Sequence, residues 1–287
     1  MTENSPLSFF SKSSIECPVC EAQFYKEELK TGRGRLNAGD ITIELRRLYV
    51  PTQKYGAVYP LIYTLIVCPS CFFSVYPQDF TRVTDTNKQK LADETDKRAE
   101  SIRRIFEDLD YQEPRTLKEG AASYFFALMC YDSFTKEAAP TIKQGISALR
   151  AAWLFSDLHR NFPLENYDYV SQLFYRKAAF FYNLAVEYEQ TGRENMVQAG
   201  NLGPDLDKNY GYDGVLYLSA YLEYTHGSKE DDTKRAQALQ NAKRTVARIF
   251  GMGRASKEKP TILLENAKDL HVTMGEEVER LTGKENP

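Results

Sequence analysis

The amino-acid sequence predicts a mainly α-helical protein with a small β module at its N-terminal end. Two Cys-Pro-x-Cys pairs, at residues 17–20 and 68–71, lie in an N-terminal stretch that is rich in glycine, proline and short β-type segments. Beyond about residue 84, long segments that are apolar on one side alternate with proline and glycine breakers, as in arrays of helices. We therefore expect a zinc-ribbon-like module over residues 1–83 and an all-α domain over residues 84–287.

Two β-type segments support the N-terminal module. Residues 41–45 alternate apolar and polar side chains, a pattern that predicts a half-buried strand. Residues 59–67 are aromatic and β-branched, and they run directly into the second cysteine pair. A strand that leads into a metal-binding turn sets the direction of the two thiols, as in a zinc ribbon.

The rest of the chain has the pattern of successive helices. Residues 87–109 are rich in charged side chains with sparse apolar positions, which predicts an exposed helix with a narrow buried stripe. We expect further helices over residues 118–134, 142–159, 167–191, 214–226, 231–250 and 261–281. Small residues at possible helix crossings, with aromatic residues between them, favour tetratricopeptide-like helical hairpins. A compact helical bundle is the alternative.

Composition restricts the class of protein. A chain of 287 residues with 42% hydrophobic residues can bury a substantial core, and its net charge of −3 argues against a general polyanion binder. Residues 1–10 lack the pattern of a secretory signal. The longest apolar stretch near the cysteine pairs, residues 61–67, is too short to cross a bilayer. We therefore expect a cytoplasmic protein that does not contact the membrane.

The two cysteine pairs predict a metal site. Cys17, Cys20, Cys68 and Cys71 can supply four thiolates in a tetrahedron, which is the coordination that zinc prefers. Since protein ligands would fill every position, we expect a structural Zn²⁺ ion. Iron in the same four-thiolate geometry and a redox-active cysteine pair are the alternatives. The fifth cysteine, Cys130, lies in an apolar run, which predicts a buried, unreactive thiol.

The sequence contains no recognisable catalytic pattern. The three histidines stand far apart, and the Gly-x-Gly at residues 32–34 lacks the rest of a nucleotide-binding fingerprint. The pattern therefore favours a protein that is not an enzyme. It does not identify any small-molecule substrate. An enzyme with a site built from acidic and tyrosine residues of the helical half is the alternative.

Two groups of side chains are candidates for binding a partner. Tyr217, Tyr221 and Tyr224 lie close in sequence in the helical half, where such aromatic residues either anchor a bound peptide or belong to the core. Arg46 and Arg47 lie among tyrosines between the cysteine pairs, where they could hold single-stranded nucleic acid or pair with nearby glutamates. The leading interpretation is a scaffold that binds a protein or peptide. A nucleic-acid-binding module is the alternative.

The order of these motifs resembles that of a bacterial family. The first Cys-Pro-x-Cys pair is followed by a long loop and a tyrosine-rich segment, which leads into the second pair. After these come helical segments that contain Ala-Ala-Trp-Leu-Phe at 151–155 and Tyr-Arg-Lys-Ala-Ala at 175–179. The combination resembles the DUF2225 family over residues 17–281. The resemblance implies a zinc ribbon followed by helices, and it implies no activity. Glu21 and Phe72 stand where many such turns carry glycine.

Overall fold

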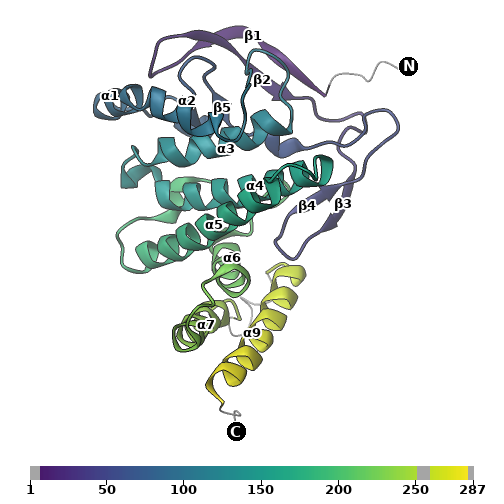
Figure 1. Cartoon of the computed structure of the whole chain (residues 1–287), viewed down its shortest axis with the longest axis vertical. Helices are drawn as coiled ribbons and strands as arrows, with labels where there is room; N and C mark the ends of the chain where they lie inside the picture. The colour runs from purple at the N-terminus through teal and green to yellow at the C-terminus, as the bar shows by residue number, and fades with distance from the viewer. Residues whose placement is uncertain (1–6, 251–258, 284–287) are drawn as a thin grey trace.

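The chain folds into stacked layers of helices with a small β region at one end (Figure 1). The structure, a computed structural model, describes residues 7–250 and 259–283. Its helices are α1 (Asp85–Asp93), α2 (Thr95–Arg103), α3 (Leu117–Tyr131), α4 (Pro140–Asn161), α5 (Tyr167–Gln190), α6 (Gly211–His226), α7 (Asp232–Ala247) and α9 (Thr261–Thr282). The predicted fold class, mainly α with a small N-terminal β module, is confirmed.

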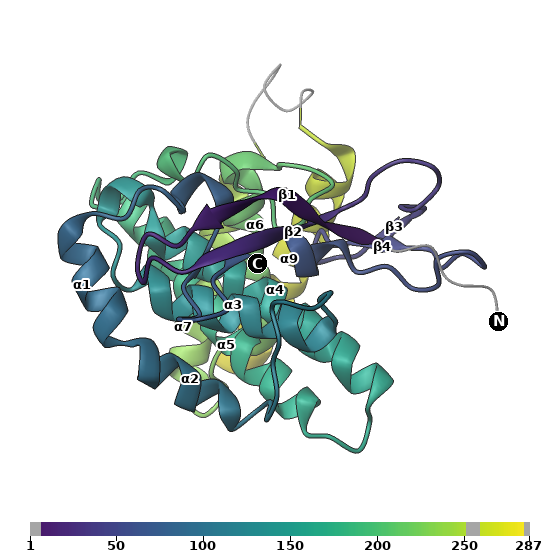
Figure 2. The ribbon, with the colours of Figure 1, turned by 90° about the horizontal axis from the view of Figure 1, so that it is seen from above.

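The β region consists of three antiparallel hairpins. They pair β1 (Ser8–Glu16) with β2 (Gln23–Leu29), β3 (Ala38–Ile41) with β4 (Arg47–Tyr49), and β5 (Ile66–Val67) with β6 (Ser74–Val75). The long β1–β2 hairpin runs across one end of the helical layers, whereas β3–β4 projects from their side (Figures 1 and 2). Short 3₁₀ helices, η1 (Pro60–Tyr63), η2 (Pro77–Asp79), η3 (Lys136–Ala138) and η4 (Met196–Ala199), connect the elements.

Helix α4 is the centre of the molecule. It packs between α3 and α5, and its side chains are buried nearly all round, as expected for a helix that is apolar on every side. Trp153, in the middle of this helix, is only 1% exposed. The neighbouring α3 begins with a capping box, in which Thr116 and Glu119 satisfy each other's backbone N–H groups. The α5 helix ends just before Gly192, whose positive φ of 66° suits a helix terminus.

Three sequence predictions differ from the structure. The strand predicted at residues 41–45 is wrong beyond Ile41, because these residues form the turn of the β3–β4 hairpin, where Leu45 has a φ of 61°. Residues 59–67 form η1 and only the two-residue strand β5, because Pro60 begins a 3₁₀ turn. The single helix predicted over residues 87–109 is broken at Glu94, whose φ and ψ of −88° and 6° separate α1 from α2.

The buried core extends through the N-terminal module and the helices. A single cluster of buried side chains runs from Cys17 through α3, α4 and α5 to Met274 in α9. The boundary predicted at residue 83 stays a prediction. The prediction that the chain lacks a secretory signal concerns residues 1–10, and residues 1–6 lie outside the described residues. None of the helices in the described ranges combines the length and the apolar composition needed to cross a membrane.

Candidate metal centre

Each cysteine pair lies in the turn of a hairpin, and the two turns have matching backbones. The first turn joins β1 to β2, and the second joins β5 to β6. In the first, the Glu21 N–H donates to the Cys17 carbonyl at 2.9 Å; in the second, the Phe72 N–H donates to the Cys68 carbonyl at 3.0 Å. Return bonds from the Cys17 and Cys68 N–H groups close both turns at 3.0 and 2.9 Å. The same local sequence has therefore produced the same local structure twice.

The residue that follows each pair adopts a left-handed backbone conformation without being glycine. Glu21 has a φ of 64° and Phe72 a φ of 56°. This conformation costs a residue with a side chain about 1–2 kcal/mol, and both side chains make contacts that oppose this cost. Glu21 pairs with Lys88 at 2.7 Å, and the Phe72 ring stacks on Phe126 with ring centres 4.9 Å apart. Glycine is therefore not required for either turn.

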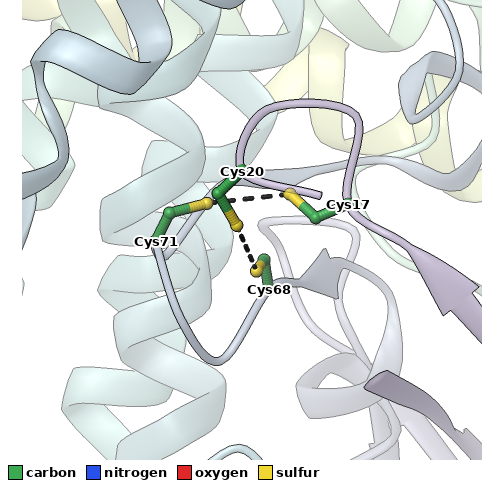
Figure 3. A group of neighbouring side chains, drawn as sticks. All are labelled: Cys17, Cys20, Cys68 and Cys71. Atoms are coloured by element: carbon green, nitrogen blue, oxygen red, sulfur yellow. Dashed lines mark hydrogen bonds between the residues drawn. The ribbon is translucent and has the colours of Figure 1, made fainter. Parts of the chain in front are cut away.

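The two turns meet and bring four sulfur atoms together (Figure 3). Cys17 Sγ lies 3.7 Å from Cys71 Sγ, and Cys20 Sγ lies 3.6 Å from Cys68 Sγ. All four lie within 4.8 Å of one another, too far apart for disulfide bonds. Metal–sulfur bonds of about 2.3 Å in a tetrahedron place neighbouring sulfurs about 3.8 Å apart. The predicted four-cysteine cluster can therefore hold a metal ion.

Backbone N–H groups of the turns point at the sulfurs. Those of Val19 and Cys20 bond to Cys17, and those of Ser70 and Cys71 bond to Cys68, and such bonds favour a thiolate. Contact with Cys17, together with these bonds, lowers the pKa of the Cys68 thiol, whereas contact with Cys68 and burial raise the pKa of the Cys17 thiol to about 12. Contact with Cys17 and Cys68, together with burial, raises the pKa of the Cys71 thiol. Four crowded thiolates repel one another, so a bound cation is required for all of them to ionise together.

A buried arginine that the sequence did not reveal supports the second turn. Arg98, on α2, is fully buried, and its Nε and Nη2 donate to the Cys71 carbonyl at 3.0 and 2.9 Å. It lies in a segment whose charged composition predicted an exposed helix, so no local signal identified it. Four thiolates around a divalent ion carry a net charge of −2, and a guanidinium against the chain of a ligand residue partly offsets this charge.

Cys130 lies beside the cluster and is not part of it. Its side chain is fully buried on α3, and its sulfur accepts a hydrogen bond from the Ser74 N–H at 3.4 Å. Burial raises the pKa of the Cys130 thiol to about 11, which keeps it protonated at neutral pH. The prediction of a buried cysteine is confirmed.

The three tyrosines proposed for partner binding lie on α6 in different environments. Tyr217 is completely buried, and its hydroxyl donates to the Ile43 carbonyl of the β3–β4 turn at 2.8 Å. Tyr221 stacks beside it with ring centres 6.0 Å apart, and Tyr224 is also partly buried. In this arrangement Tyr217 holds the β3–β4 hairpin. Partner binding by the other two tyrosines stays a prediction.

Arg46 and Arg47 bind acidic residues of the helical region. Arg46 forms an ion pair with Asp157 of α4, and Arg47 pairs with Asp207 at 2.8 Å. The Arg47 backbone N–H also donates to Asp205, at 2.6 Å. These contacts link β4 to parts of the chain that are far away in sequence. Neither guanidinium is therefore a free cation, and nucleic-acid binding by these residues stays a prediction.

A buried carboxylate completes the contact of this hairpin with the helices. Glu44, at the β3–β4 turn, accepts hydrogen bonds from the Trp153 indole and, at 3.0 Å, from the Tyr175 hydroxyl. Burial raises the pKa of Glu44, while these two donors and the Arg46 charge oppose the increase. The alternation at residues 41–45 predicts a strand, and a strand would not bring Glu44 to these donors. Asp213, farther along the chain, pairs instead with Lys259 at 2.9 Å.

Comparison with known proteins agrees with this arrangement. The model of a family described as "Uncharacterized protein conserved in bacteria (DUF2225)" matches residues 10–274, which include all four clustered cysteines. A protein of Borreliella burgdorferi strain B31, itself described as "Uncharacterized protein", is 44% identical over 276 residues, covering 96% of this chain and 99% of the relative. No solved structure matches. The chain therefore belongs to the DUF2225 family.

Proposed function

We propose that this protein is a non-enzymatic cytosolic scaffold, in which a structural zinc ion holds the N-terminal module and the helical region binds a protein or peptide. The observation that carries the proposal is an outward-facing row of exposed apolar side chains on α5, beside a groove. The closed four-cysteine cluster supports a structural role for the metal, because four protein ligands leave no position for water or substrate. Free thiolate ligands also persist best in a reducing compartment.

Zinc is the metal that we propose. The sulfur spacing suits both zinc and iron, since both accept four thiolates in a tetrahedron. A zinc ion has no redox chemistry of its own, which suits a site whose role is to join two hairpin turns. Metal analysis of protein purified without chelator is expected to give one zinc per chain. A visible iron–thiolate absorption band would assign iron instead.

The partner surface that we propose runs along α5. Tyr169, Leu173 and Phe180 share one side of this helix and are 64%, 37% and 60% exposed. A groove of about 900 Å³ lies beside Phe180, between α5 and the turn that joins α6 to α7. Arg176, Lys229 and three glutamates lie among its lining residues. An aromatic anchor surrounded by polar side chains is the usual composition of a peptide-binding surface.

The nucleic-acid alternative has less support. Arg46 and Arg47 already pair with carboxylates, and side-chain exposures of 12% and 20% leave little guanidinium surface for phosphate. Binding of single-stranded oligonucleotides that disappears in the Arg46→Ala, Arg47→Ala double variant, with folding intact, would favour this alternative over the scaffold.

A site-specific photo-crosslinker tests the scaffold proposal. Benzoylphenylalanine placed at Phe180, in the full chain expressed in its native cell, is expected to capture a discrete protein. The control position is Val272 on α9, which is 53% exposed and does not line the groove. For the purified partner, Phe180→Ser is expected to weaken binding about 30-fold, as for an interface hot spot. No capture at Phe180 above the Val272 control, or an unchanged affinity, would refute the proposal.

A further inference from the structure

A second cavity, distinct from the α5 groove, lies between the N-terminal module and α4. Its volume is about 390 Å³, and β2, η1, η2, α4 and the segment after η4 contribute its lining. Tyr63, Tyr76, Ile146 and Leu206 provide an apolar surface. A cavity of this size suits a small molecule.

A buried cation without an ion-pair partner lies in the wall of this cavity. Arg150, on α4, is 4% exposed. Within the described ranges, no carboxylate lies within 4.0 Å of its guanidinium. Its Nε and Nη2 donate to the carbonyls of Pro204 and Gly203 at 2.8 and 3.2 Å, and its Nη1 to the Tyr76 hydroxyl at 3.4 Å. The carbonyls account for the position of Arg150. The buried carboxylate of Asp205 balances part of its charge from beyond ion-pair distance, so the guanidinium has no direct acidic partner among the described residues.

Not every N–H group of the two cations in the cavity wall has an assigned acceptor. A guanidinium has five N–H groups; three of those of Arg150 make the bonds given above, and the guanidinium also contacts the Tyr124 hydroxyl. Lys143, two turns earlier on α4, is 1% exposed and donates to Asp79 at 2.6 Å, which leaves two of its three N–H groups without an assigned acceptor. At the mouth, Lys26 pairs with Glu28 at 2.9 Å.

We propose that this cavity binds a small molecule with an acidic group, either a carboxylate or a phosphate, and an apolar or aromatic body. The acidic group accepts hydrogen bonds from Arg150 and Lys143 and becomes the direct ionic partner that Arg150 does not have among the described residues. The body of the molecule lies against Tyr63, Tyr76 and Ile146, which are also cavity-lining residues. Lys143 pairs directly with Asp79 at 2.6 Å, whereas Arg150 has no carboxylate within ion-pair distance in the described part of the chain, so Arg150 is the cation more open to an added acidic group.

Calorimetric titration of the full, metal-loaded protein with three probes tests the chemistry. Phenyl phosphate and benzoate carry the two acidic groups, and benzamide is a neutral molecule of similar shape. At least one anion is expected to bind saturably, and benzamide is expected not to bind. The anion that binds identifies the acidic group. No saturable binding of either anion up to millimolar concentration, or equal binding of benzamide, would overturn the proposal.

Charge changes at the cavity mouth test the location without disturbing the core. Leu206 lines the cavity and is 46% exposed, so substitution is expected to leave the fold intact. Leu206→Glu is expected to weaken anion binding roughly fivefold, and Leu206→Lys to strengthen it by a similar factor. The matched control is Leu164→Glu, at a fully exposed position outside the cavity lining, which is expected to change nothing. Equal effects of the two glutamate variants would refute this location.

Arg150→Met tests the central residue. The variant is expected to abolish binding of the anion that the wild-type protein binds. If it folds and retains wild-type affinity, the proposal is overturned. If the Arg150→Met variant does not fold, the Leu206 variants still test whether the anion binds in this cavity. The α5 crosslinking experiment uses other residues, so failure of the scaffold proposal and failure of this one are distinguishable.

Discussion

Substitution of Gly120 by alanine tests how the helices support the cysteine cluster. Gly120 lies in α3, where alanine normally stabilises a helix by about 1 kcal/mol relative to glycine. A Cβ atom at this position would lie 2.4 Å from Ile62 Cγ2, 2.5 Å from Ile62 Cβ and 3.1 Å from Ile62 Cα. Two of these contacts involve atoms that no change of rotamer can move. The close approach therefore requires glycine.

The two opposing effects give a net loss of stability. Overpacking of this kind costs about 1–3 kcal/mol, so after the helical gain of about 1 kcal/mol we expect Gly120→Ala to lower the free energy of unfolding by up to about 2 kcal/mol. Because Ile62 lies in η1, just before the strand that leads to Cys68, the displacement is also expected to speed removal of the proposed metal ion by a chelator.

Gly275→Ala is the matched control. Gly275 is a buried glycine of α9, and a Cβ there would meet only the end of a flexible side chain, Lys243 Nζ at 2.8 Å. This variant is expected to gain about 0.5–1 kcal/mol. Urea unfolding of the two variants and the wild-type protein, all purified without chelator and followed by circular dichroism, measures both changes. Stabilisation by Gly120→Ala equal to that by Gly275→Ala would contradict the close packing of α3 on η1.

Three further predictions concern the cysteine cluster and two buried charges. If the cluster holds the zinc ion proposed above, Cys71→Ser is expected to lose it and unfold the N-terminal module, because a structural zinc contributes about 10–16 kcal/mol. Cys130→Ser is expected to keep the metal, and equal metal content of the two variants would contradict this. Arg115→Met leaves the Glu27 carboxylate, which is 1% exposed, without its cation. We expect this variant to lower the free energy of unfolding in urea by about 3–5 kcal/mol, and we expect Glu27→Gln to restore part of that loss in the double variant. Burial raises the pKa of Glu44, so the folded state binds this proton more tightly than the unfolded state, and stability falls as pH rises from the unfolded pKa through the folded one. Glu44→Gln is expected to flatten that part of the pH profile, and an unchanged urea midpoint profile would show that Glu44 does not titrate there.

Much of the helical architecture could be predicted from the sequence because its signals are local. Apolar periodicity located the long helices, and Pro140 and Gly192 stand at ends of α4 and α5. The β region was harder to predict. No sequence pattern predicted the β1–β2 hairpin, which carries the first cysteine pair. The alternation at residues 41–45 predicted a strand where the chain turns. In that turn, Glu44 points toward Trp153 and Tyr175, so distant residues decided its conformation.

The sequence alone determined the four candidate ligands, because identical Cys-Pro-x-Cys spacing builds identical turns wherever they occur. Only the tertiary structure decided that the two turns meet, since residues 21–67 separate them and their approach depends on packing against α3. It also decided the surroundings of every charged residue discussed above. Arg46 and Arg47 form ion pairs with acidic residues of the helical region, whereas no carboxylate of residues 7–250 or 259–283 lies within ion-pair distance of Arg150. Ion pairing depends on distances between residues far apart in the chain, and no local pattern encodes these distances.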